Sequence, residues 1–129
     1  MKKSIVFPGQ GSQYLGMGKY LYDNFSVSKH IFDEVDDALN TKLTKIIFGD
    51  NQNELNFTEN TQPAIMAVSI ATLEALKKDR GIVIDDFNYC AGHSLGEYSA
   101  LVAAKSIKLS DAAKILKKRG QAMQNAVPL

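Results

Sequence analysis

Hydrophobic positions in this chain form two short runs separated by longer helical patterns. The first run, residues 4–7, is β-branched and aromatic, which predicts a buried strand. The second run begins at Tyr89 and leads directly into a glycine-rich turn. We therefore expect two strands in this chain.

A long helix is predicted from Thr-Gln-Pro at residues 61–63, with the proline in its favoured first turn. Positions 64–76 are apolar on nearly all sides, so this helix must be largely buried. Gly81 is expected to end it. The preceding residues, 49–60, are polar and rich in asparagine, which predicts a surface loop.

An amphipathic helix is predicted after Ser26, a residue type that favours the N-cap. Its apolar positions recur at a spacing of four, and its acidic side chains occupy the other, solvated face. The apolar positions are Val27, Ile31, Val35 and Leu39, and the acidic ones are Asp33, Glu34, Asp36 and Asp37. Shorter helices are predicted at residues 15–24 and 42–48.

The last helix is predicted to start at Ser110, which can cap it. A rotation of about 100° per residue places its apolar residues on one stripe. These residues are Ala112, Ile115, Leu116 and Met123. Arg119 falls in the middle of that stripe, although arginine is rarely buried unpaired. An internal ion pair, snorkelling to the edge, or a fork that binds a carboxylate or phosphate would each explain it. The periodicity alone does not separate these explanations.

The chain is organised around Gly92-His93-Ser94-Leu95-Gly96, which stands between the second run and a helix of small residues. Strand, tight turn and helix in this order are the context of a nucleophile elbow. Such a turn holds the serine in a strained conformation, and the two glycines remove Cβ atoms that would collide. A glycine-rich turn with a buried or capping serine is the alternative, and the flanking elements favour the elbow.

Composition bounds the class of protein. The 129 residues suffice for one domain, and the hydrophobic and charged shares, 45% and 22%, are those of a globular protein. A net charge of +1 without a basic cluster argues against nucleic-acid binding. The single cysteine, Cys90, suits a reducing compartment and is expected to pack rather than act as a nucleophile. No apolar run has membrane-spanning length and no His or Cys stands at metal-ligand spacing, so we expect a cytoplasmic protein without a metal.

A second glycine-rich segment, Pro-Gly-Gln-Gly-Ser-Gln at residues 8–13, ends the first strand. Tyr14 stands where a dinucleotide fingerprint needs its third glycine, and no Gly-Lys-Ser/Thr follows as in a P-loop. A loop that approaches a ligand and an ordinary turn are equally compatible with these residues.

Four motifs occur in a fixed order: FPGQGSQ at 7–13, TQPA at 61–64, GHSLGEYSAL at 92–101 and RG at 119–120. Together they closely resemble those of bacterial malonyl-CoA:acyl-carrier-protein transacylases. The resemblance covers the whole chain without a departure at any motif. Many hydrolases share the elbow, but its combination with the opening loop is restricted to this family and to related acyltransferase domains of polyketide and animal-type fatty-acid synthases.

The resemblance implies that Ser94 takes malonyl from coenzyme A as a serine ester and passes it to the phosphopantetheine thiol of acyl-carrier protein, in fatty-acid biosynthesis. It implies an oxyanion hole from the backbone N–H groups of Gln10 and Leu95. Arg119 would grip the malonyl carboxylate, which would favour malonyl over acetyl. No cofactor is expected, because malonyl-CoA is a substrate and the carrier protein brings the phosphopantetheine. Gln62 is given only a packing or loop-anchoring role.

The implied fold class is α/β, with residues 1–129 as the N-terminal part of the large, α/β-hydrolase-like subdomain. The parallel sheet is expected to be incomplete in this chain, and the ferredoxin-like subdomain and the C-terminal return to be absent from it. The family takes its catalytic base from a histidine much further along, and neither His30 nor His93 matches it. We therefore expect these residues alone to be inactive.

Three alternatives remain at this point. A serine hydrolase would share only the elbow and would hydrolyse simple esters. A non-catalytic fragment would bind the carrier protein independently of Ser94 and without acyl transfer. A polyketide-type acyltransferase would use another extender unit, because the family's further specificity residues match positions beyond 129.

Overall fold

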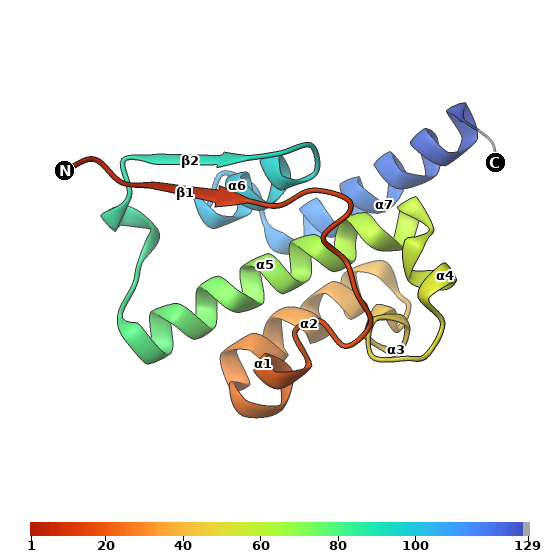
Figure 1. Ribbon diagram of the computed structural model, residues 1–129, viewed down its shortest axis with the longest axis horizontal. Helices are drawn as coiled ribbons and strands as arrows, with labels where there is room; N and C mark the ends of the chain where they lie inside the picture. Colours follow the sequence, from red (N-terminus) through yellow and green to blue (C-terminus); the bar gives the residue numbers. More distant parts are fainter. Residues whose placement is uncertain (128–129) are drawn as a thin grey trace.

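The computed structural model describes residues 1–127, which form two strands, seven α-helices and one short 3-10 helix. In chain order these are β1 (Ser4–Phe7), α1 (Lys19–Asn24), α2 (Ser26–Leu39), α3 (Leu43–Ile47), α4 (Gln52–Asn56), α5 (Thr58–Arg80), η1 (Ile84–Asp86), β2 (Tyr89–Gly92), α6 (Gly96–Ala103) and α7 (Leu109–Ala126). The strands lie side by side along one edge of the molecule (Figure 1). The chain is thus mostly helical with a small sheet.

The two strands are parallel, with Ser4 opposite Tyr89 and Phe7 opposite Gly92. Parallel pairing requires a crossover, and here the whole segment from α1 to η1 supplies it. Because both strands end at the same edge, the opening loop and the elbow leave the sheet together. The expected parallel sheet, incomplete in this chain, is therefore confirmed.

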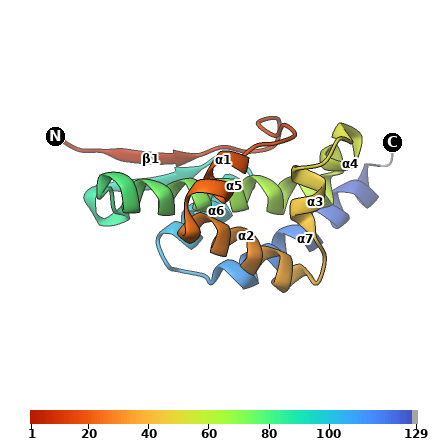
Figure 2. The same ribbon diagram turned by 90° about the horizontal axis from the view of Figure 1, so that it is seen from below.

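Helix α5 is the centre of the core. Twelve of its residues are buried, from Asn60 to Ala75, as expected for a helix that is apolar on nearly all sides. The strands lie on one side of it, and α2 and α7 lie on the other (Figure 2). Helix α6 packs against both α5 and the strands. Gly81 ends the helix in the left-handed conformation, φ +66°, as predicted.

The start of α5 differs from the prediction. The helix begins at Thr58, so Pro63 lies in its interior rather than in its first turn. The segment before it is not a plain loop either, because residues 52–56 form α4. Asn51 caps α4 by accepting a hydrogen bond from the Glu54 N–H at 3.2 Å. The asparagine-rich composition therefore marks a helix cap as well as loop residues.

Two other predicted helix starts are also wrong. Ser26 and Ser110 are helical residues and cap nothing, because α2 and α7 are preceded by Phe25 and Lys108, neither with a side-chain cap. The first predicted helix is shorter than 15–24, since turns precede α1. The helix predicted at 42–48 is confirmed by α3.

Burial departs from the sequence pattern at two places. Val6 in β1 is 73% exposed, and only Phe7 in that strand is buried, so the strand is not the fully buried one expected. Asp36, predicted on the solvated face of α2, is 5% exposed. Its carboxylate accepts hydrogen bonds from the Thr44 N–H and hydroxyl at 3.1 and 2.6 Å, which explains how a carboxylate can be buried there.

Candidate active site

The turn between β2 and α6 has the geometry of a nucleophile elbow. Ser94 adopts φ +56°, a left-handed conformation that non-glycine residues rarely take. A Cβ atom on Gly92 would overlap the backbone of Gly96, and one on Gly96 would overlap the Phe7 carbonyl oxygen. The strained serine and the requirement for two glycines are thus both present, as the sequence predicts.

The opening loop packs directly on this turn. The His93 N–H donates to the Phe7 carbonyl oxygen at 3.1 Å, and a Cβ atom on Gly9 would come within 2.5 Å of the His93 carbonyl oxygen. Gln10 follows in the same loop. Within residues 1–127, the backbone N–H groups of Gln10 and Leu95 donate no hydrogen bond. Neither N–H group is therefore used by another acceptor among these residues.

Arg119 reaches the elbow from α7. Its Nη2 donates to the Ser94 Oγ at 3.2 Å, and its Nη1 donates to the Gln62 Oε1 at 2.8 Å. The guanidinium carbon lies 5.6 Å from the centre of the Tyr98 ring, within the range of a cation–π interaction. The nucleophile and the arginine that the sequence singled out are thus brought into contact.

The charge of Arg119 has no anionic partner in the described part of the chain. The ion pairs among residues 1–127 are Lys19–Asp23, Arg80–Asp79 and Lys117–Glu59. An internal ion pair therefore does not explain why arginine stands on the inner side of α7. A half-buried cation held only by neutral acceptors attracts an anionic ligand.

The helical stripe of α7 differs partly from the prediction. Ala112 and Leu116 are buried as expected, together with Ala113 and Gly120. Ile115 and Met123 are each 42% exposed. The stripe is rotated toward the small residues because Gly120 lies against the backbone of Thr58 and Glu59 at the start of α5.

Gln62 is the residue of this site whose contact the sequence reasoning missed. It is 1% exposed and accepts a hydrogen bond from Arg119 across 57 sequence positions. The available signal was a polar residue at the start of a helix that is otherwise apolar, since a buried polar side chain needs a partner. Periodicity could not identify that partner.

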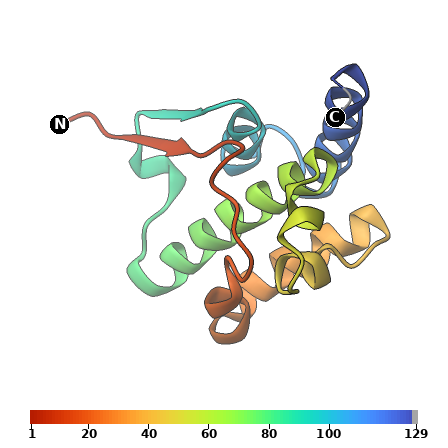
Figure 3. The same cartoon turned by 45° about the vertical axis from the view of Figure 1, so that its right-hand side comes forward.

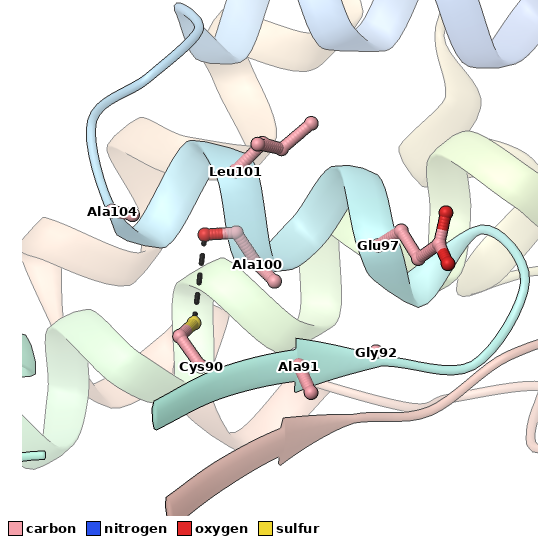
Figure 4. Close-up of a pocket in the computed structure, with 7 residues that line it drawn as sticks. All are labelled: Cys90, Ala91, Gly92, Glu97, Ala100, Leu101 and Ala104. Atoms are coloured by element: carbon pink, nitrogen blue, oxygen red, sulfur yellow. Dashed lines mark hydrogen bonds between the residues drawn. The ribbon is translucent and has the colours of Figure 1, made fainter. Parts of the chain in front are cut away.

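A shallow groove, separate from the contact of Arg119 with Ser94, lies between β2 and α6 (Figure 4). It is lined by Cys90, Ala91, Gly92, Glu97, Ala100, Leu101 and Ala104, and neither Ser94 nor Arg119 belongs to it. The Cys90 thiol donates to the Ala100 carbonyl oxygen at 3.6 Å, and desolvation raises its pKa. A thiol that stays protonated is a poor nucleophile, which agrees with the packing role predicted for this cysteine.

Neither histidine serves the serine. His30 and His93 are both exposed, and the Ser94 Oγ receives a hydrogen bond only from Arg119 within residues 1–127. In the same part of the chain, no cluster of three or more His, Cys, Asp or Glu side chains could hold a metal ion. No helix there is long and apolar enough to cross a membrane.

The fold and the elbow define a class of protein: the chain belongs to the family described as the acyl transferase domain, whose model matches residues 5–129. Within that class, the chain is 50% identical to a malonyl CoA-acyl carrier protein transacylase of Bacillus subtilis over 127 residues. The match covers 98% of this chain and 39% of the relative. The chain thus spans about two fifths of the length of its relatives.

Solved structures give the same result. An acyl-carrier-protein-S-malonyltransferase from Bartonella henselae is 49% identical with a TM-score of 0.94, and the match covers 98% of this chain and 40% of that one. A malonyl-transacylase in complex with a type II PKS acyl-carrier protein is 41% identical with a TM-score of 0.89, over 99% of this chain and 40% of that one. The resemblance to malonyl-CoA:acyl-carrier-protein transacylases is confirmed, and so is the fold.

Proposed function

We propose that this chain supplies the nucleophile, the oxyanion donors and the acyl-binding arginine of a malonyl-CoA:acyl-carrier-protein transacylase. The observation that carries the proposal is the contact of Arg119 with Ser94 at 3.2 Å, without a neutralising carboxylate among residues 1–127. A simple serine hydrolase has no need of a cation beside its nucleophile.

The distance between these two side chains favours a short, carboxylated acyl group. In malonyl-CoA one methylene separates the carboxylate from the thioester carbonyl. An acyl carbonyl placed against the Ser94 Oγ therefore brings that carboxylate within reach of Arg119, whose fork can bind both oxygens. Acetyl would leave the half-buried guanidinium without its anion, so the proposed site selects malonyl.

Transfer takes place in two displacements. The Ser94 Oγ attacks the thioester carbonyl, the new C–O bond forms, the C–S bond breaks, and coenzyme A leaves as the thiol with the serine proton. The phosphopantetheine thiol of acyl-carrier protein then attacks the ester, its sulfur takes the acyl carbon, and the proton returns to Ser94. In both steps the N–H groups of Gln10 and Leu95 stabilise the tetrahedral oxyanion.

The proton transfers need a base that residues 1–127 do not place beside Ser94. We propose that a histidine from another segment supplies it, as in the family. Residues 1–129 are then the N-terminal part of the large subdomain, and a ferredoxin-like subdomain and a C-terminal return complete the enzyme. The proposed partners are malonyl-CoA and acyl-carrier protein, with no cofactor, in the cytoplasm and in fatty-acid biosynthesis.

The test uses a hybrid transacylase, in which residues 1–129 replace the matching segment of the Bacillus subtilis relative. The hybrid is expected to transfer malonyl from coenzyme A to holo acyl-carrier protein, with a malonylated Ser94 detected by intact mass. Ser94→Ala is expected to abolish both. A folded hybrid that only hydrolyses the thioester, or that transfers no acyl group to the carrier, would contradict the proposal.

A further inference from the structure

We propose that Gln62 is a positioning residue that holds the Arg119 fork in the orientation required by the acyl carboxylate. This inference rests on the proposed function. Gln62 is 1% exposed, and its Oε1 accepts from Arg119 Nη1 at 2.8 Å, while Arg119 Nη2 points to Ser94. The two terminal nitrogens of the guanidinium are thus assigned to different partners, so the plane of the fork is set.

The orientation of the Gln62 amide follows from chemistry. Arginine has only donors, so the Oε1 of Gln62 must face it and the Nε2 must face away. The Nε2 lies 3.1 Å from the Met123 Sδ, one turn further along α7 than Arg119. A thioether is a weak acceptor. The amide is therefore held by the arginine contact and by burial in α5.

A neutral acceptor is what this position requires. A carboxylate at residue 62 would pair with the guanidinium and satisfy the charge that we assign to the acyl group. An apolar side chain would leave Nη1 without its acceptor and the long side chain free to adopt other rotamers. Glutamine holds the arginine in place without neutralising it.

The surroundings leave little other freedom to the arginine. The Tyr98 ring lies 5.6 Å from the guanidinium carbon, and Gly120 allows α7 to approach the backbone of α5. Figure 3 shows the second half of α7 beside the N-terminal end of α5, where Gln62 lies. Neither of these contacts fixes a particular nitrogen of the fork; among residues 1–127, only the hydrogen bonds of Nη1 to Gln62 and of Nη2 to Ser94 do so.

The experiment compares three variants of the hybrid transacylase. Gln62→Leu and Gln62→Glu change the acceptor, and Thr61→Val is the matched control. Thr61 is also buried in α5, but its hydroxyl donates to the carbonyl oxygens of Leu55 and Phe57 and does not contact Arg119. Each variant is assayed with malonyl-CoA and acetyl-CoA, and binding of both thioesters is measured by calorimetry in the Ser94→Ala background.

Gln62→Leu is expected to lower kcat/KM for malonyl about tenfold, mostly through KM, and to change the acetyl value less than about threefold. Gln62→Glu is expected to lower malonyl transfer further at neutral pH, again without an equal loss for acetyl. The binding ratio of malonyl-CoA to acetyl-CoA should fall in parallel. Thr61→Val should lower the unfolding temperature. It should leave unchanged the malonyl-to-acetyl ratio of kcat/KM and the malonyl-to-acetyl ratio of binding.

The outcomes separate the two proposals. A starting hybrid without a preference for malonyl contradicts the proposed function and removes the basis of this inference. A hybrid that prefers malonyl, and keeps that preference in a folded Gln62→Leu or Gln62→Glu variant, overturns the positioning role alone. If Gln62→Leu does not fold, the malonyl-to-acetyl ratio of kcat/KM in the near-isosteric Gln62→Glu variant tests the positioning role.

Discussion

At the scale of single residues, the most informative side chain is the charged one of Arg119. Its side chain is half-buried, and the acceptors that it binds, Gln62 and Ser94, are both neutral. Burying a charge without an opposite charge is costly, and this cost supports the proposal that an anion occupies the site during function. The same guanidinium donates to Ser94, so the proposed acyl-binding group and the proposed nucleophile are in direct contact.

Replacing Arg119 in the hybrid transacylase should therefore lower the activity with malonyl-CoA much more than the activity with acetyl-CoA. Arg119→Ala is expected to lower kcat/KM for malonyl-CoA about 100-fold, since a hydrogen-bonded charge pair is lost, and that for acetyl-CoA less than about tenfold. Arg119→Lys is the matched variant, which retains the charge but not the fork, and its malonyl value should lie between those of arginine and alanine. Equal losses for both thioesters would rule out a carboxylate-binding role.

The contact between α5 and α7 is the main feature at the scale of elements. Gly120 makes it close, because a Cβ atom there would come within 2.5–2.7 Å of the Thr58 and Glu59 backbone. Polar side chains seal its exposed edge: Lys117 pairs with Glu59 at 3.3 Å, and Gln121 donates to the same carboxylate at 3.1 Å. The pKa of Glu59 is lowered, and the hydrogen bond from Gln121 is the largest cause. This helix pair places Arg119 beside Gln62.

Gly120→Ala should destabilise the hybrid, although alanine ordinarily stabilises a helix relative to glycine. Alanine in a helix interior is ordinarily up to about 1 kcal/mol better than glycine. Here the added methyl meets backbone rather than a flexible side chain, so we expect a net loss of about 1–2 kcal/mol in the free energy of unfolding. Malonyl transfer should fall as well, because α7 must move away from α5.

Ala122→Gly is the matched control for this substitution. Ala122 is exposed on the same helix, and glycine there should cost about 1 kcal/mol by helix propensity alone, without an effect on transfer. Denaturant unfolding of both variants measures the difference. A Gly120→Ala variant that is more stable than the starting protein would show that the two helices are not held at this distance.

At the scale of the whole molecule, the parallel strands bring the opening loop and the elbow to one edge. That edge holds Ser94, together with Gln10 and Leu95, whose N–H groups donate to no acceptor among residues 1–127, and α7 brings Arg119 into contact with Ser94. The described residues thus bring together the side chains that we propose as nucleophile and acyl-binding cation, with two candidate oxyanion donors. A histidine or carboxylate that could take the Ser94 proton is not in contact with it among residues 1–127.

We therefore expect the isolated 129-residue chain to react negligibly with malonyl-CoA, because a serine without a base is a weak nucleophile. Intact mass spectrometry after incubation measures this directly. The hybrid transacylase is the positive control and should gain one malonyl group that Ser94→Ala removes. Rapid and stoichiometric malonylation of the isolated chain, dependent on Ser94, would mean that these residues contain their own base.

Local features could be predicted from the sequence to a large extent. The strand, turn and helix around Ser94, the two obligatory glycines and the end of α5 at Gly81 depend on backbone conformation within a few residues. The errors concern helix starts and burial. Ser26 and Ser110 are good cap residues in isolation, but the observed caps are Phe25, one position earlier, and Lys108, two positions earlier. Asp36 is buried because Thr44 satisfies its carboxylate.

By itself, the sequence determined the elbow, the buried central helix and the anomaly of an arginine on an inner helix face. Each of these follows from the spacing of neighbouring residues along one element. Only the tertiary structure decided that Arg119 lacks a carboxylate partner among residues 1–127, and that it donates hydrogen bonds to Ser94 and to Gln62. These contacts join residues 25 and 57 positions apart, and such distances are set by the packing of α5, α6 and α7 rather than by any local pattern.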